Sequence, residues 1–148
     1  MHCEIGSWGQ AVHADVRAAY NRWEERRLRS VHRVLKGSNP WTEHYSAVMA
    51  EVPDAADPGT GLNQALVDRL APASRLFIAG QASSHCVRAT TEHLVEHLGG
   101  ALQRVVLLTD AMSPVAGFDG PAADFLAAMR QRGLQAVTCA DALRTLHD

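Results

Sequence analysis

The sequence predicts an α/β fold of three layers, in which helices cover both faces of a mainly parallel β-sheet. Two short apolar runs, residues 76–80 and 105–108, have the length and composition of buried strands. Segments with the apolar spacing or the composition of helices separate the predicted strands along the chain. Strands that are apolar along their length and alternate with helices are typical of parallel sheets covered on both faces.

Helices and strands are expected to alternate from the start of the chain. Residues 9–29 predict an amphipathic helix, because their apolar side chains recur at close to helical spacing. Residues 30–36 predict a short strand, and the turn-forming residues of 37–61 predict a loop. The later elements are expected in this order: a helix at 63–70, a strand at 76–80, a helix at 84–98, a strand at 105–108, a helix at 121–132, a strand at 134–139 and a helix at 140–147.

The composition is that of one globular domain spanning residues 1–148. The chain has 148 residues, of which 47% are hydrophobic and 20% are charged, enough for a single core. The formal net charge of -2, without a basic stripe, argues against nucleic-acid binding. No apolar stretch is long enough to span a membrane, and the first residues lack the pattern of a signal sequence. Three cysteines without paired spacing indicate a reducing, cytoplasmic location.

Cys86 is the strongest candidate for a reactive residue. A predicted buried strand ends at Gly80, a short turn follows, and a helix is expected to begin near Ser84 or His85. Cys86 would then lie in the first helical turn, where free backbone N–H groups and the helix dipole favour the thiolate. The same N–H groups could stabilise an oxyanion on a carbonyl that Cys86 attacks. The position alone leaves open that Cys86 is a small core residue, the commonest role of a free cysteine.

Lys36 is the candidate partner of Cys86. It stands at the end of the predicted strand at 30–36, so a parallel topology could bring it to the same edge of the sheet as Cys86. Ligands in such sheets bind beyond the carboxyl ends of the strands. Without further information, an ordinary exposed lysine is the favoured interpretation.

Four segments resemble motifs of the nicotinamidase/isochorismatase-like superfamily of cysteine hydrolases, in its nicotinamidase-like branch. Residues 77–90 are similar to the cysteine motif, residues 36–47 to the lysine motif, and residues 106–111 to the strand and aspartate after the cysteine helix. Residues 2–9 resemble a motif in which a histidine before a cysteine helps to hold a metal ion. The segments follow the family order and span nearly the whole chain.

The resemblance implies an isochorismatase-like hydrolase fold and an amidase reaction. Cys86 would attack the carbonyl of a small carboxamide and form a thioester while ammonia leaves, and water would then release the acid. Lys36 would hold the thiolate and the developing charge. The turn at Gln81 and Ala82 would match a cis peptide that directs backbone N–H groups at the oxyanion, with His85 beside it.

The resemblance also implies a divalent metal, which would be zinc, manganese or iron. His2 would be one ligand, and the metal would hold the pyridine nitrogen of the substrate. The other family ligands, an Asp-x-His pair, and the catalytic aspartate at the end of the first strand belong upstream of residue 1. We therefore expect a family member without its first strands, weakly active or inactive alone, and prone to associate as a homo-oligomer.

Several other side chains have two open interpretations each. Trp41 and Tyr45 could form walls around a flat aromatic substrate or could pack in the core. His93 and His97 have the spacing of metal ligands, but a solvated helix face is the favoured interpretation. Asp110 is interpreted as a helix cap or turn residue rather than as a catalytic group.

The sequence leaves three functions open. The first is an amidase acting on nicotinamide or a related small carboxamide. The second is a hydrolase of the same superfamily acting on another small amide or a carbamoyl compound. The third is a non-catalytic remnant that serves as a binding or oligomerisation module.

Overall fold

The computed structural model describes residue 4, residues 6–100 and residues 102–146. It divides into two compact units, Met1–Val34 and Leu35–Asp148. The first unit contains α1 (Ala14–Arg27), and the second contains all the other helices and the sheet. The interpretation of residues 1–148 as one domain stays a prediction.

Helix α1 confirms the predicted N-terminal helix over a shorter range. The Nδ1 atom of His13, the N-cap, accepts a hydrogen bond from Asp15 N at 3.3 Å. The helix ends where Leu28 adopts the left-handed conformation, with φ of 49°. Two arginines in the last turn, Arg26 and Arg27, interact favourably with the negative end of the helix dipole.

The strand predicted at residues 30–36 is wrong. This segment has irregular backbone, and the described sheet contains no partner strand for it. A strand is stabilised by the hydrogen-bond ladder to its neighbour, and apolar composition alone does not supply that ladder. The N–H of Val31 instead donates to the Glu24 carboxylate at 2.8 Å.

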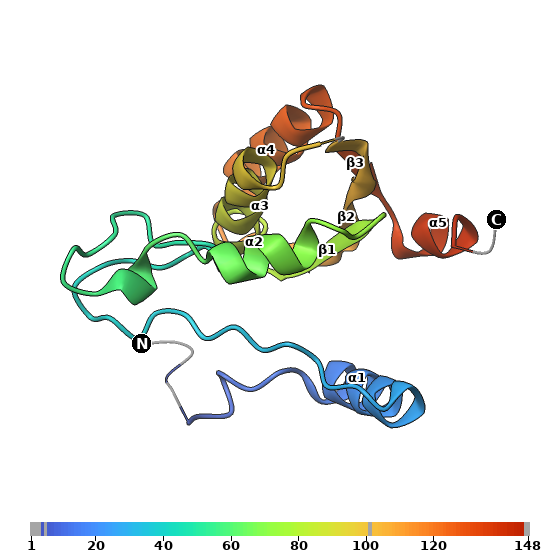
Figure 1. Cartoon of the computed structure of the whole chain (residues 1–148). Coiled ribbons are helices and arrows are strands. Elements are labelled where there is room, and N and C mark those ends of the chain that lie inside the picture. Colours follow the sequence, from blue (N-terminus) through green and yellow to red (C-terminus); the bar gives the residue numbers. More distant parts are fainter. Residues whose placement is uncertain (1–3, 5, 101, 147–148) are drawn as a thin grey trace. The chain divides into compact units, whose positions relative to one another are not determined.

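The sheet confirms the predicted parallel α/β fold. Its strands are β1 (Leu76–Gln81), β2 (Val105–Ser113) and β3 (Gln135–Val137), in the spatial order β1-β2-β3, and both pairs are parallel. Helix α3 (Cys86–His97) connects β1 to β2, and α4 (Asp119–Gln131) connects β2 to β3. In Figure 1, α3 and α4 lie on one side of the sheet, and α5 (Cys139–Arg144) lies on the other.

The core of the second unit lies between the sheet and α3 and α4. Its fully buried side chains include Val105 and Leu107 on β2 and Phe125 on α4. Exposure alternates along β1, an edge strand of the described sheet, and Phe77 on its open face is 37% exposed. Within the described residues, no helix has both the length and the apolar character needed to cross a bilayer.

The loop after residue 36 is fixed in place by packing and hydrogen bonds. Val48 and Ala50 are completely buried, and the Asn39 amide donates to the carboxylates of Asp54 and Asp57 at 3.0 and 3.1 Å. A 3-10 turn, η1 (Pro58–Thr60), and helix α2 (Gln64–Leu70) follow the loop and lead to β1. A second 3-10 turn, η2 (Leu102–Arg104), precedes β2. The backbone around residue 36 is therefore supported even though it belongs to no strand.

Candidate active site

Cys86 is the first residue of α3, so it lies in the first helical turn, as the sequence predicts. Strand β1 ends at Gln81, the Gln81–Ala82 peptide is cis as the resemblance implied, and His85 is the N-cap residue of α3. The turn is closed by the Ala82 carbonyl, which accepts from His85 N and Val87 N at 3.0 Å each. The N–H of Cys86 finds no acceptor among the described residues. A free donor therefore lies directly beside the thiol, at the positive end of the helix dipole.

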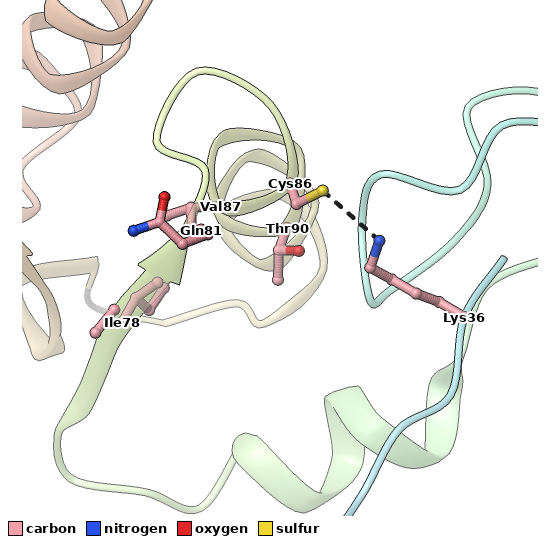
Figure 2. A pocket seen from close by; sticks show the side chains of 7 residues that line it. Lys36, Ile78, Gln81, Cys86, Val87 and Thr90 are labelled. Carbon is pink, nitrogen blue, oxygen red and sulfur yellow. Dashed lines mark hydrogen bonds between the residues drawn. The ribbon is translucent and has the colours of Figure 1, made fainter. Parts of the chain in front are cut away.

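Lys36 lies next to Cys86. Its Nζ atom is 3.6 Å from Cys86 Sγ and donates to the His44 carbonyl at 2.8 Å, and the two side chains point toward each other in Figure 2. Among the described residues, no carboxylate forms an ion pair with this ammonium. Lys36 reaches the thiol from the loop rather than from the predicted strand end.

The His44 carbonyl is a part of the site that the sequence reasoning missed. It orients the Lys36 ammonium through the backbone, so the type of side chain at position 44 gives no signal of this role. The pKa of the His44 imidazole is lowered by burial and by the positive charge of Lys36, while Glu51 acts in the opposite direction. A neutral imidazole is therefore favoured beside the ammonium.

A cavity of about 190 Å³ contains the thiol and the ammonium. This volume is below the range of about 300–1,000 Å³ that is usual for ligand pockets, so only a small ligand would fit inside it. Much of its wall is apolar, and the polar side chains lie at the Lys36–Cys86 pair, at Gln81 and at Thr90. The lining residues are Lys36, Ile78, Ala79, Gln81, Cys86, Val87 and Thr90.

The other predicted site residues lie at different places around this cavity. Gln81 lines it, and its amide is bound to Ser113 Oγ by contacts of 2.9 and 3.0 Å. Tyr45 and His85 lie outside the lining and meet edge to face, with ring centroids 5.5 Å apart. Trp41 is 87% exposed and also lies outside the lining. The substrate roles assigned to these residues and to Ala82 stay predictions.

The described residues do not fit the metal site that the resemblance implied. No group of three or more His, Cys, Asp or Glu side chains gathers anywhere in the described part of the chain. His2, the predicted ligand, lies outside the described residues. On α3, His97 is exposed, whereas His93 is partly exposed and its Nδ1 atom is buried with no hydrogen-bond partner among the described residues.

Asp110 acts as a cap, in agreement with the favoured interpretation. Its carboxylate accepts from the N–H of Cys139, the first residue of α5, at 2.7 Å. This hydrogen bond lowers the pKa of Asp110. The side-chain hydrogen bond from the Cys139 thiol to the same carboxylate raises the pKa of Cys139. The two cysteines of the second unit therefore have opposite surroundings, a cation at Cys86 and an anion at Cys139.

Comparison with solved structures finds proteins with a similar fold. The yeast nicotinamidase Pnc1p bound to the inhibitor nicotinaldehyde matches 93% of this chain with a TM-score of 0.65 and 18% identity. The pyrazinamidase of Pyrococcus horikoshii in complex with zinc matches 93% of the chain with a TM-score of 0.60 and 22% identity. The chain has the nicotinamidase fold.

A third structure with the nicotinamidase fold is the Acinetobacter baumanii nicotinamidase and pyrazinamidase, which matches 95% of the chain with a TM-score of 0.60 and 17% identity. The chain spans 57%, 62% and 59% of the lengths of these three proteins. No family model and no curated protein matches the sequence. The similarity to the nicotinamidase fold therefore rests on the course of the backbone. The resemblance of the segments around Lys36 and Cys86 to family motifs rests on the sequence.

Proposed function

We propose that this chain carries the nucleophile and its cationic partner of a cysteine amidohydrolase for small carboxamides. The observation that carries the proposal is the 3.6 Å contact between Lys36 Nζ and Cys86 Sγ at the N-terminus of α3. An ammonium beside a thiol stabilises the nucleophilic thiolate. The nicotinamidase fold and the small cavity support nicotinamide and related aromatic amides as the first substrates to test.

The reaction proceeds through a thioester. The Cys86 thiolate attacks the amide carbonyl carbon, the C–S bond forms, and the carbonyl electrons move to oxygen. The free N–H of Cys86 and the Lys36 ammonium are the nearby groups that can stabilise this oxyanion. The carbonyl then re-forms and the C–N bond breaks as the nitrogen takes a proton from solvent water and leaves as ammonia. Water attacks the thioester carbonyl, the C–S bond breaks, and the acid is released with the thiol restored.

Proton transfer is the step for which the described cavity is poorly equipped. Neither a carboxylate nor an imidazole is among the residues that line the cavity in the described part of the chain. General acid–base catalysis typically contributes about 10²–10⁴-fold to the rate. We therefore propose that the 148-residue chain by itself releases ammonia slowly or not at all. The expected divalent metal, cytoplasmic location and homo-oligomeric state stay predictions, and no step above depends on them.

Ammonia release from nicotinamide and a panel of small amides and carbamoyl compounds tests the reaction. The assay compares the wild-type chain with Cys86→Ala and, as a matched control, Cys139→Ala, with and without added zinc or manganese. Slow release that disappears only in Cys86→Ala supports the proposal. Release that persists in Cys86→Ala refutes the role of this thiol.

The reactivity of the thiol provides a second test that needs no turnover. Iodoacetamide at mildly acid pH is expected to modify Cys86 much faster than Cys139, as resolved by peptide mass spectrometry. Equal modification of the two residues in the folded chain, together with no ammonia release, would favour the non-catalytic binding module instead.

A further inference from the structure

Three aromatic rings from three separate segments meet beside Cys86. The His85 ring lies edge to face against Tyr45, at a centroid distance of 5.5 Å and an angle of 68°. It meets Phe118 in the same manner, at 4.8 Å and 69°. Such T-shaped pairs are favourable beyond the area that they bury. We call Tyr45, His85 and Phe118 the aromatic clamp.

The His85 ring is also connected, through the hydroxyl of Ser84, to the segment that leads into α4. Its Nδ1 atom lies 2.8 Å from the Oγ atom of Ser84, which is buried. The same Oγ atom accepts from Val115 N at 3.0 Å, and the N–H of Phe118 donates to the Val115 carbonyl at 2.9 Å. The segment that carries Phe118 is thus tied to the turn that carries the nucleophile.

Each reactive side chain is linked to the aromatic clamp through the adjacent residue. Cys86 directly follows His85, and the His44 carbonyl, which binds the Lys36 ammonium at 2.8 Å, directly precedes Tyr45. The contact between the Tyr45 and His85 rings therefore holds the two parts of the Lys36–Cys86 pair against each other. A second link in the same direction is the hydrogen bond from Ala47 N to Thr90 Oγ1 on α3, at 3.0 Å.

We propose that Phe118 is a positioning residue, which packs on His85 and so keeps the Lys36 ammonium beside the Cys86 thiol. Phe118 is 43% exposed, so it contributes less to core burial than the fully buried Phe125. Its ring is nevertheless in direct contact with the residue before the nucleophile. The proposal rests on the proposed function only for the partnership of Lys36 and Cys86, and it requires no substrate.

The experiment measures the alkylation rate of Cys86 at pH 6.5 in a chain that also carries Cys3→Ser and Cys139→Ser. Lys36→Met is expected to slow the reaction about tenfold or more, because it removes the cation beside the thiolate. Phe118→Ala and the milder Phe118→Leu are expected to slow it about three- to tenfold, and Phe118→Tyr to retain the rate. In the Lys36→Met background, Phe118→Leu is expected to have no further effect, because the two changes act on one contact.

Phe77→Ala is the matched control, since Phe77 is 37% exposed and lies on the open face of β1, outside the aromatic clamp. It is expected to leave the rate unchanged. The proposal is overturned if Phe118→Leu leaves the rate unchanged, if it raises the rate by loosening the turn, or if it slows the Lys36→Met variant equally.

The two proposals fail in distinguishable ways. An unchanged rate in Lys36→Met refutes the partnership assigned under the proposed function, and the positioning role with it. A slow Lys36→Met variant beside an unaffected Phe118→Leu variant refutes the positioning role alone. If the chain releases no ammonia, the alkylation rates still test the positioning role, because alkylation of Cys86 does not require turnover.

Discussion

Thr90 and Thr91 are adjacent residues of α3, and the structure predicts that replacing Thr90 by valine destabilises the chain more than replacing Thr91. Thr90 Oγ1 accepts a hydrogen bond from the Ala47 backbone N–H at 3.0 Å, and so ties the lysine loop to the helix. Thr91 Oγ1 donates to the Val87 carbonyl of its own helix at 2.7 Å, and its side chain is completely buried. Valine has nearly the same shape as threonine and nearly the same helix propensity. The two substitutions therefore differ mainly in the hydrogen bond that each removes.

Thr90→Val leaves the part-buried Ala47 N–H without an acceptor. An unsatisfied buried donor costs about 1–3 kcal/mol, and partial burial favours the lower part of that range, about 1–2 kcal/mol. With a urea m-value of about 2 kcal/mol per molar, the midpoint of unfolding should fall by about 0.5–1 M. Thr91→Val leaves no donor unsatisfied, because only the hydroxyl is lost, and should change stability by less than about 1 kcal/mol.

Urea unfolding followed by circular dichroism measures both variants, and hydrogen exchange of the Ala47 amide reports the loop directly. We expect faster exchange at Ala47 and slower alkylation of Cys86 in Thr90→Val alone. Equal midpoints for the two variants, or equal loss of protection at Ala47, would show that this hydrogen bond does not hold the loop. The reasoning would be refuted equally by a Thr90→Val variant that alkylates at the wild-type rate.

Three further predictions concern Asp110 and the core. Asp110→Asn should accelerate alkylation of Cys139 and leave Cys86 unchanged, since the carboxylate raises the pKa of the Cys139 thiol; unchanged Cys139 labelling, read by mass spectrometry, would argue against it. The pKa of Asp110 is lowered from 3.8 in the folded chain, so its contribution to stability is present above that pH and is lost as the pH falls through the folded value. On lowering the pH from about 5 to about 2, a range that brackets the titration of a carboxyl group, the Asp110→Asn variant should therefore lose less stability than the wild-type chain. Thermal unfolding at each pH measures this difference. Phe125→Ala, at a side chain only 1% exposed, should lower the free energy of unfolding by about 3–5 kcal/mol, and a urea midpoint within error of wild type would contradict this assignment of the core.

The sequence predicted the sheet where apolar composition and strand pairing agree. Residues 76–80 and 105–108 are apolar, and both lie in parallel strands. Strand β2 continues to Ser113, well beyond its apolar part, because it pairs with the end of β1 through Met112 and Ser113. The strand expected at 30–36 has apolar residues but no ladder. Pairing between distant segments is a tertiary property that local composition does not encode.

The site residues also fall into those that the sequence could reveal and those that it could not. Cys86 and Lys36 could be singled out because their chemistry is in their side chains and their surroundings match known motifs. The His44 carbonyl could not, since every residue has a carbonyl and only the folded loop directs this one at Lys36. Phe118 follows β2 in an exposed segment, and its contact with His85 arises from packing across separate segments. Contacts of this kind are found only after the elements are assembled.

The reciprocal contact between Gln81 and Ser113 has a consequence for molecular selectivity. Both amide atoms of Gln81 are engaged by Ser113 Oγ, and Thr90 Oγ1 is engaged by Ala47. The charged and nucleophilic side chains of the cavity are Lys36 and Cys86, while the side chains of Ile78, Ala79 and Val87 are hydrocarbon. Such an apolar surface distinguishes ligands by their shape and size. An apolar pocket separates two ligands that differ by one methylene group by only about 10–200-fold. Under the proposed function, we therefore expect weak discrimination among ring substituents and stronger discrimination of the group placed beside Lys36 and Cys86.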